Sequence, residues 1–479
     1  METLFKPSHN CHHRIAAHRA AVVIDGADYY QALHQAFRRA EASIFIVGWD
    51  LHSEVRLIRD DDTDGYPERL GELLDRLADE KPHLQIYLLS WDFAMIYAME
   101  REFFPRYKLK WRTHNRVHFG LDGHHPVGAS QHQKVIVIDD ALAFVGGLDV
   151  SQWRWDTPRH RPRDDRRVDP RGETYPPFHD VQMAVDGPAA AEMGKLVRER
   201  WERSEGDRPD MSTPDASADP WPPCLKPDFR DIRIAIARTL PAYEDQPQVQ
   251  EVRQLYRDSI AAARHAIYIE NQYLSANCIG EALEKRLEDK DGPEIVIVMP
   301  EKTGGWLEQH TMDVLRGRLV AGLRAADHHD RLRIYYVRLE KAPHCSLMVH
   351  AKVMIVDDHF LRIGSSNLSN RSMGLDSECD LAIAATDEDD NLRKAIAGIR
   401  ARLLAEHLGK KTEAVARAIE THGAIIPAIE SLRDGARTLM PLSAEIPAEV
   451  DEWVPESQLL DPEKPVPPDE LLDLFVSPE

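Results

Sequence analysis

The sequence predicts an α/β protein built from two similar halves. The stretch "HQKVIVIDD", which begins at His132, returns as "HAKVMIVDD", which begins at His350. Each copy keeps a histidine, a lysine two residues later and an aspartate five residues after the lysine, with apolar residues between lysine and aspartate. Strand-like and helix-like segments alternate in the same order around both copies, so the chain is predicted to be an internal duplication.

The predicted elements correspond in chain order. Each half opens with an amphipathic helix that runs into a strand, followed by a buried strand, the motif and a further strand. The corresponding segments are the helix–strand units 32–51 and 255–274, the buried strands 84–92 and 294–302, and the strands that begin at Asp180 and Glu378. A helix closes each half, and Gly409 stands where the C-terminal cap of the second helix is expected.

The same pattern gives the expected domain boundaries. We expect the first half over residues 1–204, a linker rich in Pro, Asp and Ser over 205–225, and the second half over 226–440. Residues 441–479 are rich in proline and acidic residues and are predicted to be an extended arm. Residues 156–177 have no counterpart in the second half, which indicates an insertion.

Composition and charge narrow the class of protein. A hydrophobic content of 43% with 29% charged residues is typical of a folded globular chain, and no apolar run is long enough to cross a bilayer. The net charge of −21 disfavours broad binding to nucleic acid or to anionic lipid. Five scattered cysteines without a CxxC pair, and an N-terminus without a signal-peptide core, predict reduced thiols in a cytoplasm.

Each motif is predicted to form a β-hairpin. Residues two apart in a strand share a face, so His132 and Lys134 are expected to point the same way. Asp139 falls at the turn, where its carboxylate would stabilise the turn as a hydrogen-bond acceptor. The second copy repeats this arrangement with His350, Lys352 and Asp357.

The expected turn length also gives a register for the two hairpins. We expect two-residue loops at 140–141 and 358–359. The returning strands would then place Asp149 opposite the histidine of the first copy and Asn367 opposite the histidine of the second.

Two histidines and two lysines in one place predict chemistry on a phosphate group. Two lysines form a pocket for an anion, and phosphate is the natural candidate. One neutral histidine can attack phosphorus and hold a covalent phosphoryl group, while the other donates a proton to the departing oxygen. Each imidazole needs a carboxylate at its other nitrogen, and Asp180 and Glu378 are the aligned candidates. Because lysines supply the positive charge, we expect neither a metal nor another cofactor.

The duplicated His-x-Lys-x4-Asp motif resembles the signature of the phospholipase D superfamily. The second copy ends in the Gly-Ser-x-Asn of that family, whereas the first reads "GGLD", with Asp149 in place of the asparagine. This difference resembles the phospholipase-type branch rather than the nuclease branch. Three further segments resemble plant and animal phospholipases: "RWDTPRH" (154–160), "FHDV" (178–181) and "YIENQYL" (268–274). The likeness spans most of residues 15–410.

The resemblance implies two α/β/α halves, with mixed sheets flanked by helices, around a pseudo-twofold axis and a single site at their junction. It implies His132 as the nucleophile and His350 as the general acid and later base. Which of Asp180 and Glu378 orients which histidine stays open. The expected site residues are the catalytic set His132, Lys134, Asp139, His350, Lys352 and Asp357, the orienting carboxylates Asp180 and Glu378, and the phosphate-binding residues Ser365, Asn367 and Asp149.

These observations lead us to expect a phospholipase D that hydrolyses the head-group phosphodiester of a glycerophospholipid, or transfers it to an alcohol, through a phosphohistidine. The expected partners are a phospholipid at a membrane surface and water or an alcohol, without nucleic acid. No oligomer is needed, because one chain carries both halves of the site. We expect a cytoplasmic protein with peripheral access to the membrane. The alternatives are a cardiolipin synthase-like phosphatidyltransferase, a nuclease and a non-catalytic protein that binds lipids or anions.

Overall fold

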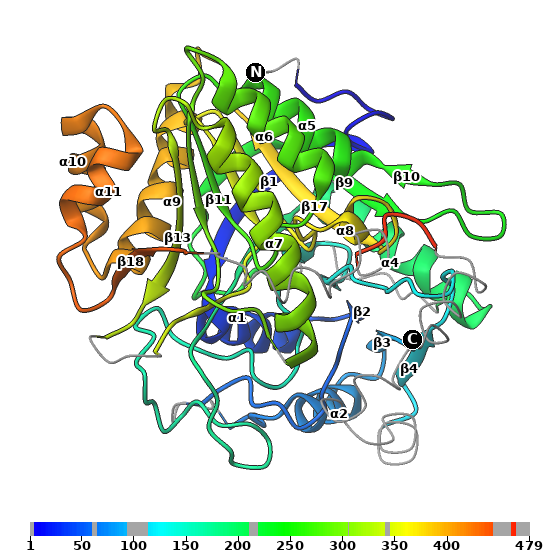
Figure 1. The fold of residues 1–479 in the computed structure, drawn as a ribbon. Coiled ribbons are helices and arrows are strands. Elements are labelled where there is room, and N and C mark those ends of the chain that lie inside the picture. Colours follow the sequence, from blue (N-terminus) through cyan, green and yellow to red (C-terminus); the bar gives the residue numbers. More distant parts are fainter. Residues whose placement is uncertain are drawn as a thin grey trace, which may run out of the picture.

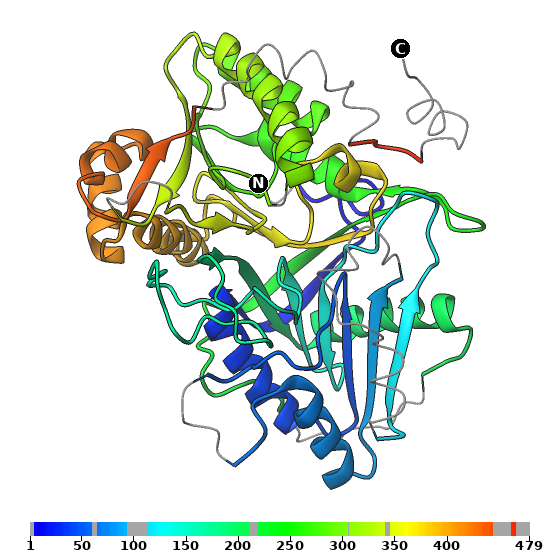
Figure 2. The same cartoon turned by 60° about the horizontal axis from the view of Figure 1, so that its bottom comes forward.

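One continuous β-sheet passes through both halves of the chain in the computed structural model (Figures 1 and 2). The structure describes residues 4–59, 65–92, 114–209, 219–304, 306–340, 345–443 and 461–465.

In the first half, the chain forms β1 (His13–Ile24), α1 (Asp25–Arg39), β2 (Ser43–Gly48), α2 (Leu70–Glu80), β3 (Gln85–Trp91), β4 (Val117–Asp122), β5 (Val135–Ile138), β6 (Leu142–Gly146), β7 (Phe178–His179), β8 (Val181–Asp186) and α4 (Pro188–Glu205). The second half contains β9 (Phe229–Leu240), β10 (Val249–Gln250), α5 (Glu251–Ala262), β11 (Ala266–Glu270), α6 (Asn277–Glu288), β12 (Glu294–Val298), α7 (Trp306–Ala326), β13 (Leu332–Arg338), β14 (Met348–Val349), β15 (Val353–Val356), β16 (Phe360–Gly364), α8 (Asn370–Gly374), β17 (Glu378–Ala384) and α9 (Asp390–Leu408). The elements α10 (Thr412–His422), α11 (Ile425–Leu432) and β18 (Thr438–Pro441) follow.

The order of the strands confirms the predicted duplication. From the centre outward, the first half runs β1-β8-β6-β5-β2-β3-β4 and the second runs β9-β17-β16-β15-β11-β12-β13. Each sheet is mixed, because β2, β3 and β4 are parallel while the motif strands beside them are antiparallel, and the second half repeats this pattern. The central strands β1 and β9 pair antiparallel, which relates the two halves by a local twofold axis. This pairing joins the two expected sheets into one and satisfies the backbone groups that two long edge strands would leave open.

Helices cover both faces of the sheet, as the alternation of strand side chains requires. In β2, Ile44 and Ile46 pack on the side of α1 and α2, whereas Phe45 and Val47 face the opposite layer. The second half packs α5, α6 and α7 on its outer face in the same way. A single apolar layer that contains α4 and α9 covers the other face of both halves. Strands buried on both sides explain why these runs are apolar throughout.

The hairpin turns differ from the expected two-residue loops. Both loops have three residues, 139–141 and 357–359, because Ile138 pairs with Leu142 and Val356 pairs with Phe360. The expected opposition of Asp149 and Asn367 to the motif histidines was therefore wrong by one residue. The cause is the first aspartate of each loop, which takes a left-handed conformation with φ of 53° or 56° and leaves the ladder.

The expected linker and arm are described in part. Residues 210–218 of the linker, and 444–460 and 466–479 of the arm, lie outside the described residues. Residues 461–465 pack on the second half, where the buried Asp461 accepts hydrogen bonds from the backbone N–H groups of Asn370 and Arg371. Gly409 ends α9 in the left-handed conformation that was predicted for a cap. In the described part of the chain, no helix has both the length and the apolar character needed to span a bilayer.

Candidate active site

The two motifs meet at the junction of the halves because each crosses to the opposite half just before its histidine. Gln131 forms a parallel bridge with Ser377, and β14 pairs in parallel with β7. His132 and His350 follow these pairings directly, and their backbone N–H groups donate to the carbonyls of Ser377 and His179. Each histidine is thereby held beside the strand of the other half that carries a predicted orienting carboxylate.

The first histidine is oriented by the carboxylate of the second half. Nδ1 of His132 lies 3.1 Å from both carboxylate oxygens of Glu378. The hydroxyls of Ser365 and Ser372 donate to this carboxylate at 2.5 and 2.6 Å. Burial raises the pKa of Glu378 well above its ordinary value. Burial, and then the charges of Lys134 and Lys352, lower the pKa of His132 well below its ordinary value. His132 is therefore neutral near pH 7, and Nε2 is the nitrogen left for attack.

The second histidine is oriented by the carboxylate of the first half. Nδ1 of His350 lies 2.6 Å from Oδ2 of Asp180, whose Oδ1 accepts the N–H of Val181 at 2.7 Å. Burial raises the pKa of Asp180 to about 7. The pKa of His350 is lowered by burial and then by the charges of Lys352 and Arg154. The pairing left open by the sequence is thus crossed, with each histidine served by the other half.

The two lysines have different surroundings. Nζ of Lys134 lies 3.0 Å from Oδ2 of Asp149, and both side chains are buried. Nζ of Lys352 lies 2.9 Å from Nδ1 of its own His350 and also donates to the carbonyl of that residue. Burial lowers the pKa of Lys352 to about 7, so an anionic phosphate would favour its charged form. The lysine of the second half is the one without a carboxylate partner among the described residues.

The three predicted phosphate-binding residues have different roles. Asp149 pairs with Lys134 and accepts the N–H of Trp49 at 2.9 Å, so its carboxylate is not placed to bind an anion. Ser365 donates to Glu378 and orients it. Asn367 is buried and its side-chain carbonyl has no hydrogen-bond partner in the described part of the molecule. The Nδ2 group of Asn367 also forms no hydrogen bond with a described residue, so it is available to donate to a phosphate oxygen.

The two motif aspartates lie away from the site, at the far ends of their strands. Asp139 accepts hydrogen bonds from the N–H groups of Glu41, Ala42 and Ser43 at 2.7–2.8 Å. Asp357 repeats this arrangement in the second half with Arg264, His265 and Ala266. Their placement with the catalytic residues was wrong, since their carboxylates fix the start of the neighbouring strands β2 and β11. The carboxylates are hydrogen-bond acceptors as expected, but their donors belong to the neighbouring strand starts and not to their own turns.

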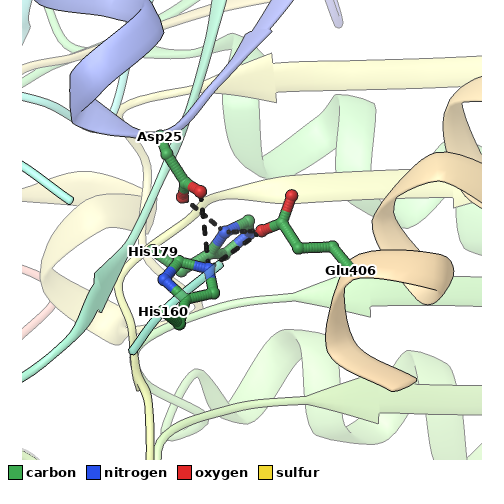
Figure 3. A group of neighbouring side chains, drawn as sticks. All are labelled: Asp25, His160, His179 and Glu406. Atoms are coloured by element: carbon green, nitrogen blue, oxygen red, sulfur yellow. Dashed lines mark hydrogen bonds and ion pairs between the residues drawn. The ribbon is translucent and has the colours of Figure 1, made fainter. Parts of the chain in front are cut away.

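A second cluster, which was not predicted from the sequence, consists of Asp25, His160, His179 and Glu406 (Figure 3). It lies next to His350, whose backbone N–H donates to the carbonyl of His179. His179 Nδ1 lies 2.9 Å from both Asp25 and Glu406, and His160 Nε2 lies 3.0 Å from Glu406 and 3.4 Å from Asp25. All four side chains are buried, and the pKa of His160 is raised to about 9 by the carboxylates against the opposing effect of burial. Two imidazoles and two carboxylates at this spacing are also a donor set that could hold a divalent cation.

Two family models match the chain. A model described as "Phospholipase D" matches residues 36–220, and a model described as "Cardiolipin synthase, PLD-like domain" matches residues 256–399. Together they cover the central parts of both halves.

Curated relatives share the same description. The chain is 27% identical over 455 residues to phospholipase D A of Dictyostelium discoideum, which covers 81% of this chain and 35% of that protein. It is 24% identical over 541 residues to phospholipase D alpha 2 of Oryza sativa subsp. japonica, which covers 81% of this chain and 65% of that protein. The chain thus spans one third to two thirds of the length of these relatives.

A solved structure shares the fold. The phosphatidylserine synthase of Haemophilus influenzae Rd KW20 aligns with 88% of this chain and 96% of its own, with a TM-score of 0.52 and 13% identity. At this identity the likeness concerns the fold alone.

Proposed function

The chain belongs to the phospholipase D superfamily, and from this premise we propose that it hydrolyses or transfers the head group of a glycerophospholipid through a phosphohistidine. The observation that carries the proposal is the crossed pairing of His132 with Glu378 and of His350 with Asp180. This pairing holds two imidazoles with their Nδ1 atoms engaged. It leaves Nε2 of His132 for attack and Nε2 of His350, 3.3 Å from Nζ of Lys352, for proton transfer.

The proposed reaction has two displacement steps at phosphorus. Nε2 of His132 attacks phosphorus while the bond to the head-group oxygen breaks. His350, whose protonated form is favoured by the negative charge of the bound phosphodiester, gives its proton to that oxygen. The phosphatidyl group is then bound to His132. Water or an alcohol attacks it, His350 accepts the proton, and His132 is released. Lys134, Lys352 and the Asn367 amide would stabilise the charge on the phosphate oxygens.

The product profile from phosphatidylcholine micelles with added ethanol tests this proposal. Wild type should release choline and form phosphatidylethanol, which requires a phosphatidyl intermediate that an alcohol can intercept. The His132→Ala variant should form neither product. If wild type forms neither, phosphatidylcholine is not the substrate, and phosphatidylglycerol and single-stranded DNA would be tried next.

A phosphatidyltransferase is the second candidate, favoured by the description of the family model that matches residues 256–399. In this reaction the acceptor alcohol is a second lipid. Cardiolipin formed from phosphatidylglycerol alone, without a water-derived product, would support this candidate over hydrolysis.

We propose that the protein works in the cytoplasm and reaches its substrate as a peripheral protein. The five cysteines are all free, which supports a reducing compartment. Fractionation of cells should recover the protein in the cytosol or in a salt-extractable membrane fraction. Recovery from an extracytoplasmic fraction would contradict the assignment.

A further inference from the structure

Arg154 places a cation without a carboxylate partner beside the second histidine. The guanidinium carbon lies 5.2 Å from the ring centroid of Phe178, and the rings of Phe178 and His350 are also 5.2 Å apart. Nε of Arg154 is buried and has no hydrogen-bond partner in the described part of the molecule. No described carboxylate forms an ion pair with this side chain within 4.0 Å, although the charge of Arg154 helps to lower the pKa of Asp149. The charge of Arg154 reaches the site, since it contributes to lowering the pKa of His350.

The other arginines of this loop that are not exposed, Arg166 and Arg167, are paired with carboxylates, which sets Arg154 apart. Arg167 lies 3.0 Å from Asp156, and Arg166 lies 2.8 Å from Asp164. A half-buried guanidinium without an anion loses hydration and gains no ion pair in return. Such a group is well suited to bind a carboxylate or phosphate, because its planar fork can donate two parallel hydrogen bonds.

The charges at the site indicate which part of the substrate Arg154 faces. Lys134 is balanced by Asp149, and Lys352 is left for the single negative charge of a phosphodiester. Arg154 is then a surplus cation. It lies beside His350, the residue that in the proposed reaction gives its proton to the head-group oxygen. A cation on that side is next to the head group rather than the diacylglycerol.

We infer that Arg154 binds a negatively charged group on the head group of the lipid, namely a carboxylate such as that of phosphatidylserine. The inference rests on the proposed function, since it uses the role of His350 to orient the substrate. Arg154 acts as a specificity-determining residue, and neutral or zwitterionic head groups without a carboxylate gain nothing from it.

Steady-state kinetics with short-chain phosphatidylserine and phosphatidylcholine test the inference. Arg154→Met should lower kcat/KM for phosphatidylserine about 10- to 100-fold more than for phosphatidylcholine, because it removes charge-assisted hydrogen bonds to the carboxylate. Arg154→Lys should recover only part of the loss, since it keeps the charge without the planar fork. Arg163→Met is the matched control, because Arg163 is an exposed arginine of the same loop, and this variant should leave the ratio unchanged. An equal loss for both lipids, or no loss for either, would overturn the inference.

A binding measurement separates failure of the inference from failure of the proposed function. Calorimetry would compare glycerophosphoserine with glycerophosphocholine on wild type and Arg154→Met, without any turnover. Tighter binding of glycerophosphoserine that is lost in Arg154→Met supports the inference even if wild type cleaves neither lipid. Equal binding of the two compounds by wild type overturns it, whatever the kinetics show. Unchanged thermal unfolding of Arg154→Met shows that the variant is folded.

Discussion

The two halves place the same histidine and lysine on the same hairpin, but they surround them differently. In the second half, the carboxylate of Glu378 accepts hydrogen bonds from two serine hydroxyls and orients His132. In the first half, Asp180 orients His350 without a serine donor. The residue that matches Ser365 is Gly147, where a Cβ atom would lie 2.3 Å from Oδ1 of Asp180. In the first half, aspartate (Asp180) replaces glutamate and glycine (Gly147) replaces serine, and the close approach of these two residues explains why the two differences occur together.

The lysines differ in the same asymmetric way. A carboxylate balances Lys134, whereas Lys352 is buried against its own histidine and has a pKa of about 7. The difference follows from one substitution in the duplicated motif, Asp149 in the first half against Asn367 in the second. Duplication preserved the geometry of the two displacement groups, and divergence of their neighbours gave each half its own electrostatics. Such a difference is expected if one histidine must attack and the other must carry a proton.

The largest expected effect separates the two histidines by their roles. His132→Ala and His350→Ala should each lower kcat on phosphatidylcholine by at least about 10⁴-fold. p-Nitrophenolate leaves without a proton, so a lipid with this head group should restore the first step, seen as a burst of p-nitrophenol, in His350→Ala but not in His132→Ala. Release of p-nitrophenol measures this difference. Restored cleavage in His132→Ala alone would reverse the assignment, and equal behaviour of the two variants would remove it.

The two orienting carboxylates should show the same difference in role, so kinetics can reveal which histidine each carboxylate serves. Glu378→Gln should lower cleavage of both lipids by about 10²–10⁴-fold, because it disturbs the nucleophile. Asp180→Asn should lower cleavage of phosphatidylcholine by a similar factor and spare most of the p-nitrophenol release. Initial rates on the two lipids measure both variants. The opposite pattern would mean that each carboxylate serves the histidine of its own half.

Asp149 is expected to contribute to the stability of the fold through its ion pair with Lys134, whereas Asn367 is not expected to stabilise Lys352. Asp149→Asn leaves Lys134 buried without its partner and should lower the free energy of unfolding by about 3 kcal/mol. Adding Lys134→Met to Asp149→Asn should recover part of this loss, which a double-mutant cycle by urea unfolding would measure. In the second half, Asn367→Ala and Lys352→Met should show little coupling. A coupling near zero for Lys134 and Asp149 would contradict the ion pair.

The serine donors should give a smaller effect, confined to the first histidine. Ser365→Ala removes one hydrogen bond to Glu378 and should lower cleavage of both lipids about 10-fold. Ser372→Ala is the matched variant, since its hydroxyl donates to the other oxygen of the same carboxylate. Rates on the p-nitrophenol lipid measure the effect free of the proton-transfer step. Loss on phosphatidylcholine alone would place the serines in the service of His350 instead.

The sequence predicted the duplication, the strands and the four histidine and lysine positions, because these features are periodic or repeated. It did not predict which carboxylate serves which histidine. That pairing depends on contacts distant in sequence, such as the bridge of Gln131 with Ser377, which follow from the joint between β1 and β9. The register error had a local cause, the left-handed conformation of Asp139 and Asp357, which no periodicity reveals.

The cluster of Asp25, His160, His179 and Glu406 was missed for a related reason. Its residues come from the start of α1, the insertion, β7 and the end of α9, and only the fold brings these four segments together (Figure 3). Each residue alone has an ordinary interpretation, such as an acidic residue in the first turn of a helix for Asp25. Partners such as Ser372 were missed because a single serine in a short helix such as α8 carries no pattern.

The electrostatic difference between the halves can be measured directly at His132. Its pKa is lowered by burial and then by Lys134 and Lys352, so the imidazole stays neutral as the pH falls to 6.5 and becomes protonated only below this value. Activity that needs the neutral form is lost as the pH falls through this lowered pKa. Lys134→Met removes one of the two charges and should move the pKa of His132 upward, toward the ordinary value.

Histidine NMR titration measures this shift, with His132→Ala used to assign the resonance. The Asp149→Asn variant sharpens the comparison, because it leaves Lys134 in place and removes a negative charge that favours protonated His132. This variant should lower the pKa of His132 further, opposite in sign to Lys134→Met. Shifts of the same sign in both variants would mean that structural change, rather than charge, controls the nucleophile.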